Sequence, residues 1–318
     1  MGSAVDWCRP VRKGMISYAG PARIRSKQGE CGALKKVLGL VASERRLGNT
    51  EMLVKAVLAN TGDDCAKEMI RLTELNLKYC KACYTCLPED VGCCLKDDLA
   101  FLLDKLKEAD AVVLGAPVYC FGPHGVIKVL QDRLFSVGSK QELFQGKRCV
   151  TITTYGVPGW EGYARSVLNQ TAHLLHLELV DSLLIHGANP GEVWLNPATL
   201  ERVSEVGRLL IDPGYGQSPG ANRCPACWGD FFKFKGDGSV ECPLCGTKGR
   251  VDSNGEQPVL SFANSGSNRI SPEGRREHFK WLTMKKAEFL AKRHQLKELQ
   301  KPYAACDWWV KPPAGQLE

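Results

Sequence analysis

The sequence VLGLVASERRLGNT, residues 37–50, decides the fold. It begins with the apolar run 37–42, which predicts a buried strand, and continues as a polar loop that ends at Thr50. An amphipathic pattern starts at Glu51 and predicts a helix over 51–59. Free backbone N–H groups at a helix N-terminus favour anions, so the order of strand, loop and helix indicates either a phosphate site or an ordinary capped helix start.

The rest of the segment up to residue 211 alternates strand patterns with helix patterns. Further strands are predicted at 68–72, 111–116, 148–154 and 178–186, and further helices at 97–109, 126–135, 163–177 and 197–211. Five strands that alternate with helices predict an α/β fold with a doubly wound, five-stranded parallel sheet. Because such sheets bind ligands at the carboxyl ends of their strands, we expect the loops after the first, third and fourth strands to converge.

Composition limits the class of protein. The chain has 318 residues, of which 44% are hydrophobic, so it is long enough for one large domain with attached segments. No run approaches the ~20 apolar residues of a membrane span and no secretory signal is recognisable, so we expect a cytoplasmic protein without membrane contact. The net charge of +7 does not by itself indicate a nucleic-acid partner, and none is expected. Fifteen cysteines, many in C-x-x-C spacings, indicate metal binding in a reducing compartment.

Changes in composition divide the chain into five segments. They are a basic, flexible extension at 1–35, the α/β domain at 36–215, a cysteine module at 222–250, a linker rich in Gly, Ser and Asn at 251–272, and a C-terminal helix with its tail at 273–318. The helix is expected over 273–299 with an apolar stripe of Phe279, Leu282, Phe289, Leu290 and Leu296. This stripe predicts packing on the chain's own domain or on a second subunit.

Three loops of the α/β domain carry motifs that occur together in one family. They are S-x-R-x-x-x-N-T at 43–50, APVYCFGPHGVIKVLQDRL at 116–134 and TTYGVPGWEG at 153–162. In this order, at consecutive strand-to-helix loops, they resemble the NADPH-dependent FMN reductase and iron–sulfur flavoprotein family. The resemblance implies a flavodoxin-like fold for 36–215 and FMN as its cofactor.

The same resemblance implies a set of cofactor-binding residues. Ser43, Arg45, Asn49 and Thr50 match the family's FMN-phosphate loop, in which Glu44 here replaces the usual proline. In the second loop Pro117, Val118 and Tyr119 match, and Tyr119 with the backbone of Cys120, Phe121 and Gly122 is expected to edge the isoalloxazine ring. The third loop would wrap the ring with Thr154, Tyr155 and Gly156. No acid–base catalyst is predicted. Asp132 and Arg133 are expected to serve the structure or subunit contacts, and His124 is expected to be structural, with contact to the flavin as the alternative.

The first cysteine group follows the second predicted strand, in the sequence YCKACYTCLPEDVGCCLKDD at 79–98. Three cysteines spaced two apart are a common start of an iron–sulfur site, and the iron–sulfur flavoproteins carry a similar motif in this loop. The predicted ligands of a [4Fe–4S] cluster are Cys80, Cys83, Cys86 and Cys93, with Cys94 as the alternative fourth ligand. A zinc site, or reduced thiols without a metal, are the alternatives.

The second cysteine group lies in CPACWGDFFKFKGDGSVECPLCG at 224–246. Two C-x-x-C knuckles on a hairpin place four thiolates in a tetrahedron, which suits Zn²⁺, and the Asp237-Gly238 pair predicts the hairpin turn. The predicted zinc ligands of this ribbon-like module are Cys224, Cys227, Cys242 and Cys245. A rubredoxin-like iron site with the same four ligands is the alternative.

These motifs together predict an FMN-dependent oxidoreductase. The resemblance implies that NAD(P)H or a ferredoxin-like protein donates electrons, that a cluster relays them, and that the chain forms a homo-oligomer; the acceptor is unknown. The alternative is a non-catalytic scaffold or regulatory protein that uses a flavodoxin-like fold, with the ribbon-like module and the long helix as docking elements.

Overall fold

The computed structural model describes residues 35–87, 91–138, 140, 143–253, 258–262, 268–304, 306, 308 and 310. Contacts divide the chain into Met1–Ala33 and Leu34–Glu318, and every described residue belongs to the second unit. The predicted extension therefore lies outside the described residues except for Lys35, as does the tail at 311–318. No helix in the described ranges has the length and apolarity needed to cross a bilayer. The five predicted segment boundaries stay predictions.

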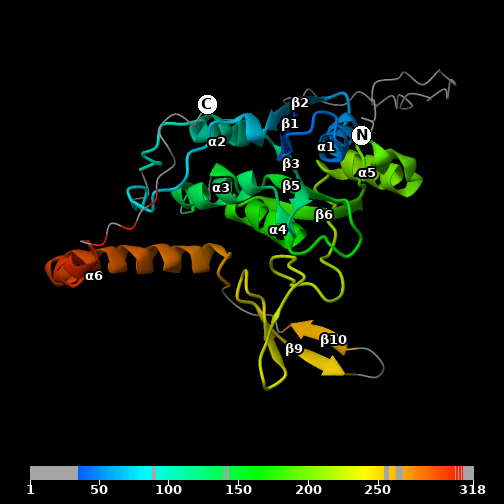
Figure 1. Ribbon diagram of the computed structural model, residues 1–318. Coiled ribbons are helices and arrows are strands. Elements are labelled where there is room, and N and C mark those ends of the chain that lie inside the picture. The colour runs from blue at the N-terminus through cyan, green and yellow to red at the C-terminus, as the bar shows by residue number, and fades with distance from the viewer. Residues whose placement is uncertain are drawn as a thin grey trace, which may run out of the picture. The chain divides into compact units, whose positions relative to one another are not determined.

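The main sheet confirms the predicted doubly wound α/β fold. Its parallel strands run in the order β2-β1-β3-β5-β6 (Figure 1), which is the flavodoxin-like order. Their bounds are Lys35–Val41 for β1, Cys65–Arg71 for β2, Ala111–Tyr119 for β3, Arg148–Tyr155 for β5 and Glu178–His186 for β6. The strand β1 pairs with both β2 and β3, so Leu40 lies between Ile70 and Leu114.

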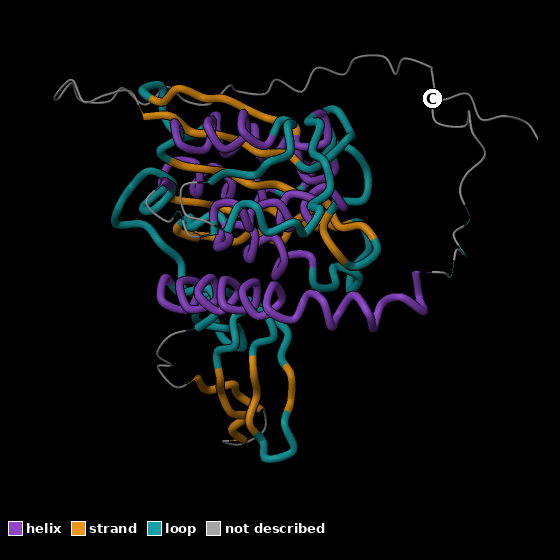
Figure 2. The backbone as a smooth tube through the Cα atoms, turned by 90° about the vertical axis from the view of Figure 1, so that its left-hand side faces the viewer, coloured by secondary structure: helices purple, strands orange, loops and turns teal. Residues whose placement is uncertain are grey.

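Helices cover both faces of this sheet (Figure 2). They are α1 (Asn49–Ala59), α2 (Leu99–Glu108), α3 (Gly125–Arg133), α4 (Ala164–Leu174) and α5 (Pro197–Leu209). The apolar faces of α1 and α5 share one buried core, and those of α2, α3 and α4 share the other. Three short helices complete this unit: η1 (Leu72–Glu74) follows β2, η2 (Leu134–Val137) follows α3, and η4 (Glu192–Leu195) lies between β6 and α5.

The start of α1 lies unusually close to the sheet. A Cβ added at Gly115 of β3 would lie 2.7 Å from the Val54 side chain and 2.9 Å from that of Thr50. The absence of a side chain at Gly115 therefore lets the N-terminus of α1 approach the ends of β1 and β3, which places the helix end at the edge where ligands bind.

The second predicted loop forms a tight hairpin. The strand β4 (Gly122–Pro123) folds back on β3, so the two residues at its turn are Cys120 and Phe121. Their φ angles are 47° and 68°, which a two-residue hairpin turn requires and which glycine or asparagine usually supplies. Two such residues in succession store backbone strain at the edge of the sheet.

A second sheet of four antiparallel strands follows, in the order β10-β9-β8-β7. Its strands are β7 (Lys233–Phe234), β8 (Ser239–Glu241), β9 (Lys248–Ser253) and β10 (Pro258–Phe262). The predicted hairpin between β7 and β8 is present, with Gly238 at a φ of 77°. The end of β9 and all of β10 lie within the segment 251–272, for which composition predicted a linker. Phe262 packs on Phe232 at 5.4 Å, a non-local contact that local composition does not reveal.

The last helix, α6 (Pro272–Ala304), is longer than the predicted 273–299. None of its residues is fully buried. Its contact with the α/β domain is near its start, where the rings of Phe279 and Phe135 stack 5.0 Å apart at 19°. The other members of the predicted stripe lie farther along, and Phe289 and Leu290 are 50% and 57% exposed.

Candidate functional site

A cavity of about 260 Å³ opens at the carboxyl ends of β1, β3, β5 and β6. Ten of the thirteen predicted cofactor residues line it, namely Ser43, Arg45, Asn49, Thr50, Pro117, Val118, Tyr119, Thr154, Tyr155 and Gly156. Cys120, Phe121 and Gly122 of the hairpin turn do not line it. Sequence reasoning missed the other lining residues, which are Gly48, Val157, Gly187, Ala188 and Pro190. Three of these follow β6, in a loop without a recognisable motif.

One end of the cavity is suited to an anion. The N-cap of α1 is Gly48, and no side chain caps the helix start. Its first-turn N–H groups therefore remain available to a ligand. The exposed Arg45 adds a positive charge, and none of the lining residues is acidic. The hydroxyls of Thr50 and Thr154, both buried, lie 2.7 Å apart across the floor.

The predicted role of Asn49 needs correction in detail. Its amide nitrogen donates to the carbonyl oxygens of Gly187 and Asn189, both at 2.9 Å, and its amide oxygen accepts from the Gly191 N–H at 2.8 Å. Both donor hydrogens are thereby used. The side chain of Asn49 ties the loop after β6 to the start of α1, instead of pointing a free donor at a ligand.

A buried ion pair fixes the shape of the loop at 43–50. The carboxylate of Glu51 accepts from Arg71 at 2.7 Å and from the Leu47 N–H at 2.8 Å, while Arg71 also donates to the Ser43 carbonyl. Burial by itself raises the pKa of Glu51, but hydrogen bonds from Lys55, Arg71 and the Leu47 N–H outweigh it and lower the pKa to about 2. Neither Glu51 nor Arg71 belongs to a motif, so this ion pair could not be predicted from the sequence.

Exposed aromatic side chains continue from Tyr119, which lines the cavity, onto the hairpin turn and the loop after β5. Tyr119 is 43% exposed, and Phe121 and Trp160 lie against each other with ring centroids 5.4 Å apart. Tyr163 is 50% exposed, and its N–H donates to the Phe121 carbonyl at 2.9 Å. His124 caps α3 by accepting from the Val126 N–H at 3.2 Å, which is the structural role expected for it.

The first cysteine group lines a second cavity of about 680 Å³. Cys80, Cys83, Cys86, Cys93 and Cys94 all face it, together with residues of α3, η2 and α6. The closest sulfurs are those of Cys83 and Cys94, 3.7 Å apart, although Cys93 was the predicted fourth ligand. A hydrogen bond from Thr85, with Cys94 contributing, lowers the pKa of the exposed Cys83 thiol to about 7. The thiols of this loop therefore line an open cavity and do not converge on the position of a single metal ion.

This loop is held by the buried pair of Asp97 and Arg133, whose side chains are 0% and 1% exposed. Arg133 also donates to the Lys78 carbonyl at 2.7 Å and to the Cys93 sulfur at 3.3 Å. Asp97 accepts from the Lys78 N–H at 2.8 Å. Because Asp97 is engaged in this way, α2 begins at Leu99 and not at residue 97 as predicted. The structural role expected for Arg133 is thereby present.

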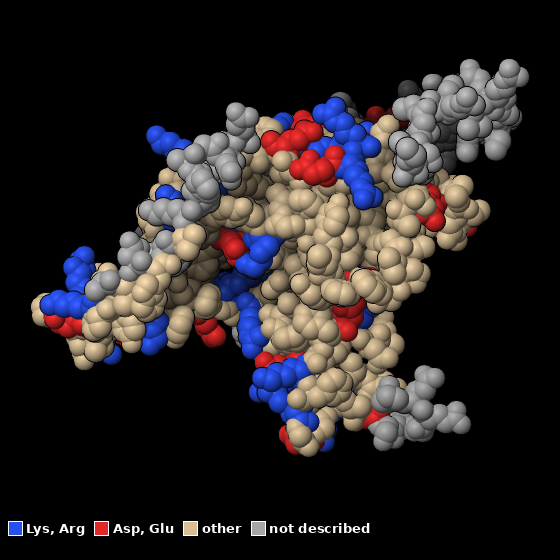
Figure 3. Space-filling view, viewed as in Figure 1, with Lys and Arg blue, Asp and Glu red and all other residues tan. Residues whose placement is uncertain are grey.

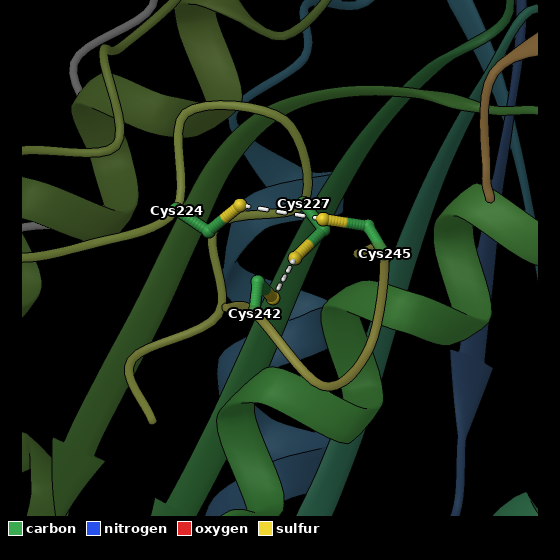
Figure 4. Close-up of side chains that lie close together, drawn as sticks. All are labelled: Cys224, Cys227, Cys242 and Cys245. Carbon is green, nitrogen blue, oxygen red and sulfur yellow. Dashed lines mark hydrogen bonds between the residues drawn. The ribbon is translucent and has the colours of Figure 1, made fainter. Parts of the chain in front are cut away.

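The second cysteine group is compact. The sulfurs of Cys224, Cys227, Cys242 and Cys245 point toward one another (Figure 4) and lie within 4.8 Å of one another. All four residues are fully buried. In the described ranges no other group of His, Cys, Asp or Glu reaches this geometry. A shell of four thiols without an open position fits a tetrahedral structural ion such as Zn²⁺.

Comparisons with known proteins can be set beside this geometry. Residues 35–185 match the sequence model of the family described as NADPH-dependent FMN reductase. A flavone synthase, cfoJ, of Aspergillus candidus is 30% identical over 185 residues, covering 49% of this chain and 57% of that protein. An iron–sulfur flavoprotein of Archaeoglobus fulgidus is 28% identical over 180 residues, covering 56% of this chain and 79% of its own.

Among solved structures, one titled flavone reductase aligns with a TM-score of 0.72 over 87% of this chain and 99% of its own, at 18% identity. At that identity the alignment shows a shared fold, and it extends well beyond the α/β domain. The chain spans little more than half the length of the Aspergillus relative.

Proposed function

We propose that this chain is an FMN-dependent oxidoreductase, because residues 35–185 match the family model described as NADPH-dependent FMN reductase. The observation that supports it most is the cavity at the carboxyl edge, where ten separately predicted residues from three loops face one space. The phosphate of FMN would lie at the start of α1, against Arg45 and the hydroxyls of Ser43 and Thr50. The isoalloxazine ring would lie between residues 117–119 and 154–157.

FMN, once bound, would supply the redox chemistry by accepting two electrons and passing them on. The residues of this chain hold and orient it. The Glu51–Arg71 pair and Asn49 fix two of the loops before FMN binds, which reduces the ordering cost of binding. NAD(P)H or a reduced protein carrier is the proposed donor. We further propose that the functional form is a homo-oligomer.

The phosphate assignment is tested by Arg45→Ala, with Arg46→Ala as matched control. Arg46 is in the same loop and is also exposed, but it pairs at 3.7 Å with Glu74 and does not line the cavity. Removing a charge-assisted contact of about 1.5–3 kcal/mol should weaken FMN binding about tenfold or more in the first variant and leave the control unchanged. Flavin fluorescence titration measures both. Equal affinities in the two variants would contradict the site, and a protein that binds no FMN would contradict the function.

We propose that the loop at 80–94 holds a [4Fe–4S] cluster. The support is the wide, thiol-lined cavity, which suits a four-iron group better than a single ion. Cys83→Ser should abolish the cluster's EPR signal in anaerobically reconstituted protein while FMN stays bound. Cys93→Ser and Cys94→Ser, compared by iron content, identify the fourth ligand. Unchanged iron in Cys83→Ser would disprove the cluster.

We propose that the buried four-cysteine group holds structural Zn²⁺. Metal analysis of protein purified without added iron should give one zinc per chain. One iron per chain with a redox-active spectrum would instead identify a rubredoxin-like centre.

A planar aromatic acceptor is the proposed substrate class. Two similar proteins are named for flavone chemistry, and Tyr119, Phe121 and Trp160 form an exposed aromatic rim beside the proposed flavin site. Such a rim stacks on flat apolar rings. Trp160→Ala should raise the KM for a flavone or a quinone at least fivefold without changing the KM for ferricyanide. An equal change for all three acceptors would contradict this assignment.

A further inference from the structure

The large cavity has a wall that no cysteine motif accounts for. Besides the thiols, Arg269, Ile270, Arg275, His278, Phe279 and Leu282 line it. These residues belong to the start of α6 and the turn before it, outside the range 35–185 that matches the family. Figure 3 shows basic side chains along the hollow beside α6.

This wall is tied to the four-cysteine module. The Arg269 N–H donates to the Cys245 carbonyl at 2.8 Å, and its guanidinium donates to the Pro243 carbonyl at 3.0 Å. The Ile270 carbonyl in turn accepts from Arg275 at 2.8 Å. Residues next to the proposed zinc therefore fix the position at which α6 begins.

The wall is also fitted to the α/β domain. Phe279 stacks on Phe135, and a Cβ added at Gly138 would lie 2.6 Å from its ring. Arg275 donates to the His173 carbonyl and to a ring nitrogen of His176, both at 2.5 Å. The start of α6 therefore makes defined contacts with both the four-cysteine module and the α/β domain.

Arg275 carries a charge that its neighbours do not balance. Its hydrogen-bond partners are two carbonyl oxygens and an imidazole, and no carboxylate of the described residues lies within 4.0 Å of it. Desolvation consequently lowers the pKa of Arg275 to about 10. By contrast, Arg276 on the next position is 59% exposed and pairs with Glu273 at 2.9 Å. A partly buried cation without a carboxylate partner, in the lining of the same cavity as five thiols, indicates an anionic occupant.

We propose that residues 269–282 form the cover of the cysteine-lined cavity and that Arg275 supplies the positive charge that an anionic, cysteine-bound iron–sulfur group requires there. The inference rests on the proposed cluster but assigns residues of the C-terminal segment to it. A nearby cation stabilises the more negative, reduced state, so Arg275 would favour reduction of the cluster. The four-cysteine module would then serve the redox site indirectly, by holding this cover in place.

The charge is tested in full-length protein, reconstituted anaerobically with iron and sulfide and poised at one fixed potential. EPR spin quantitation then gives the amount of reduced cluster, and the iron content gives the total, so the ratio of reduced to oxidised cluster follows. Arg275→Gln should lower that ratio about tenfold, because one uncompensated charge is lost at close range, whereas Arg276→Gln should change it less than twofold. Arg275→Lys keeps the charge and should restore most of the ratio. An equal ratio in the Arg275→Gln and Arg276→Gln proteins would overturn the proposed charge.

The cover is tested by the rate at which an iron chelator removes the cluster. Phe279→Ala should accelerate iron loss at least tenfold, and Phe289→Ala, on the exposed part of the same helix, should not. Equal rates would overturn the cover. A wild-type protein that retains no iron would overturn the whole inference, while its flavin absorbance would still decide the proposed oxidoreductase function.

Discussion

The two cysteine groups share their C-x-x-C spacing but are built in opposite ways. At the two ends of the loop at 80–94, protein contacts hold Lys78 and Cys93 through the buried pair of Asp97 and Arg133. In the module at 224–245 the four buried cysteines are the centre of the hydrophobic cluster, and only Ala226, Phe232, Leu244 and Ile270 pack around them, partly buried. We therefore expect the loop to keep its shape without a metal, whereas the module has only a small apolar core beside its cysteines. The comparison teaches that equal spacing does not imply equal dependence on metal.

The largest expected effect tests the module's dependence on its metal. Cys242→Ser should abolish the structural metal and unfold residues 224–262, because metal binding contributes on the order of 10 kcal/mol to folding in units of this kind. Limited proteolysis and metal analysis measure the loss. FMN binding should persist, and Cys306→Ser should leave the module intact. A Cys242→Ser protein that still resists proteolysis in this segment would break the comparison.

The next effect tests the loop's independence of metal. Arg133→Met leaves the carboxylate of Asp97 buried without its partner, so the free energy of unfolding should fall by about 3–5 kcal/mol even in protein without iron. Urea denaturation measures it. Adding Asp97→Asn to the same chain should recover part of the loss. If the loss appears only in iron-loaded protein, the loop depends on its metal after all.

A third prediction extends the comparison to the flavin loop, which a similar pair holds. The pKa of Glu51 is lowered from 4.5 to about 2 in the folded protein, so its charge contributes about 3 kcal/mol above pH 4.5. This contribution should disappear as the pH falls from 4.5 to 2. In that range the carboxylate of Glu51 binds a proton in the unfolded state but still resists protonation in the folded state, which lowers the free energy of unfolding. Glu51→Gln should lower stability by about this amount at pH 7 and flatten the acid limb of the stability curve. The matched variant Glu44→Gln, exposed in the same loop, should retain the acid limb.

The smallest effect concerns Asp132, which neighbours Arg133 and shares the same sequence motif. Asp132 pairs with Lys128 on the exposed face of α3. Because solvent screens such pairs, Asp132→Asn should lower the free energy of unfolding by about 0.5 kcal/mol or less. If Asp132→Asn lowered the free energy of unfolding as much as Arg133→Met does, membership of the motif and not burial would determine the size of the effect.

Much of the lining of the cavity at the carboxyl edge could be predicted because these residues are local to three loops. Ser43, Thr50, Tyr119 and Thr154 follow recognisable strands, and the strand order of the fold then brings them together. Asn49 was placed in the right loop but with the wrong partner, since its amide bonds to residues some 140 positions away in the chain. The loop at 187–190 had no motif and was missed for the same reason.

The sequence by itself determined the alternation of strands and helices, the three ligand loops and both cysteine groups, because each depends on spacing within a few residues. Only the tertiary structure decided which charges are buried, as for Arg71 and Arg133, and that β10 extends the small sheet. It also decided that the start of α6 faces the thiols of the loop at 80–94. The physical reason is that burial and charge pairing depend on which distant segments of the chain come into contact. Neither hydrophobic periodicity nor motif spacing carries information about such contacts.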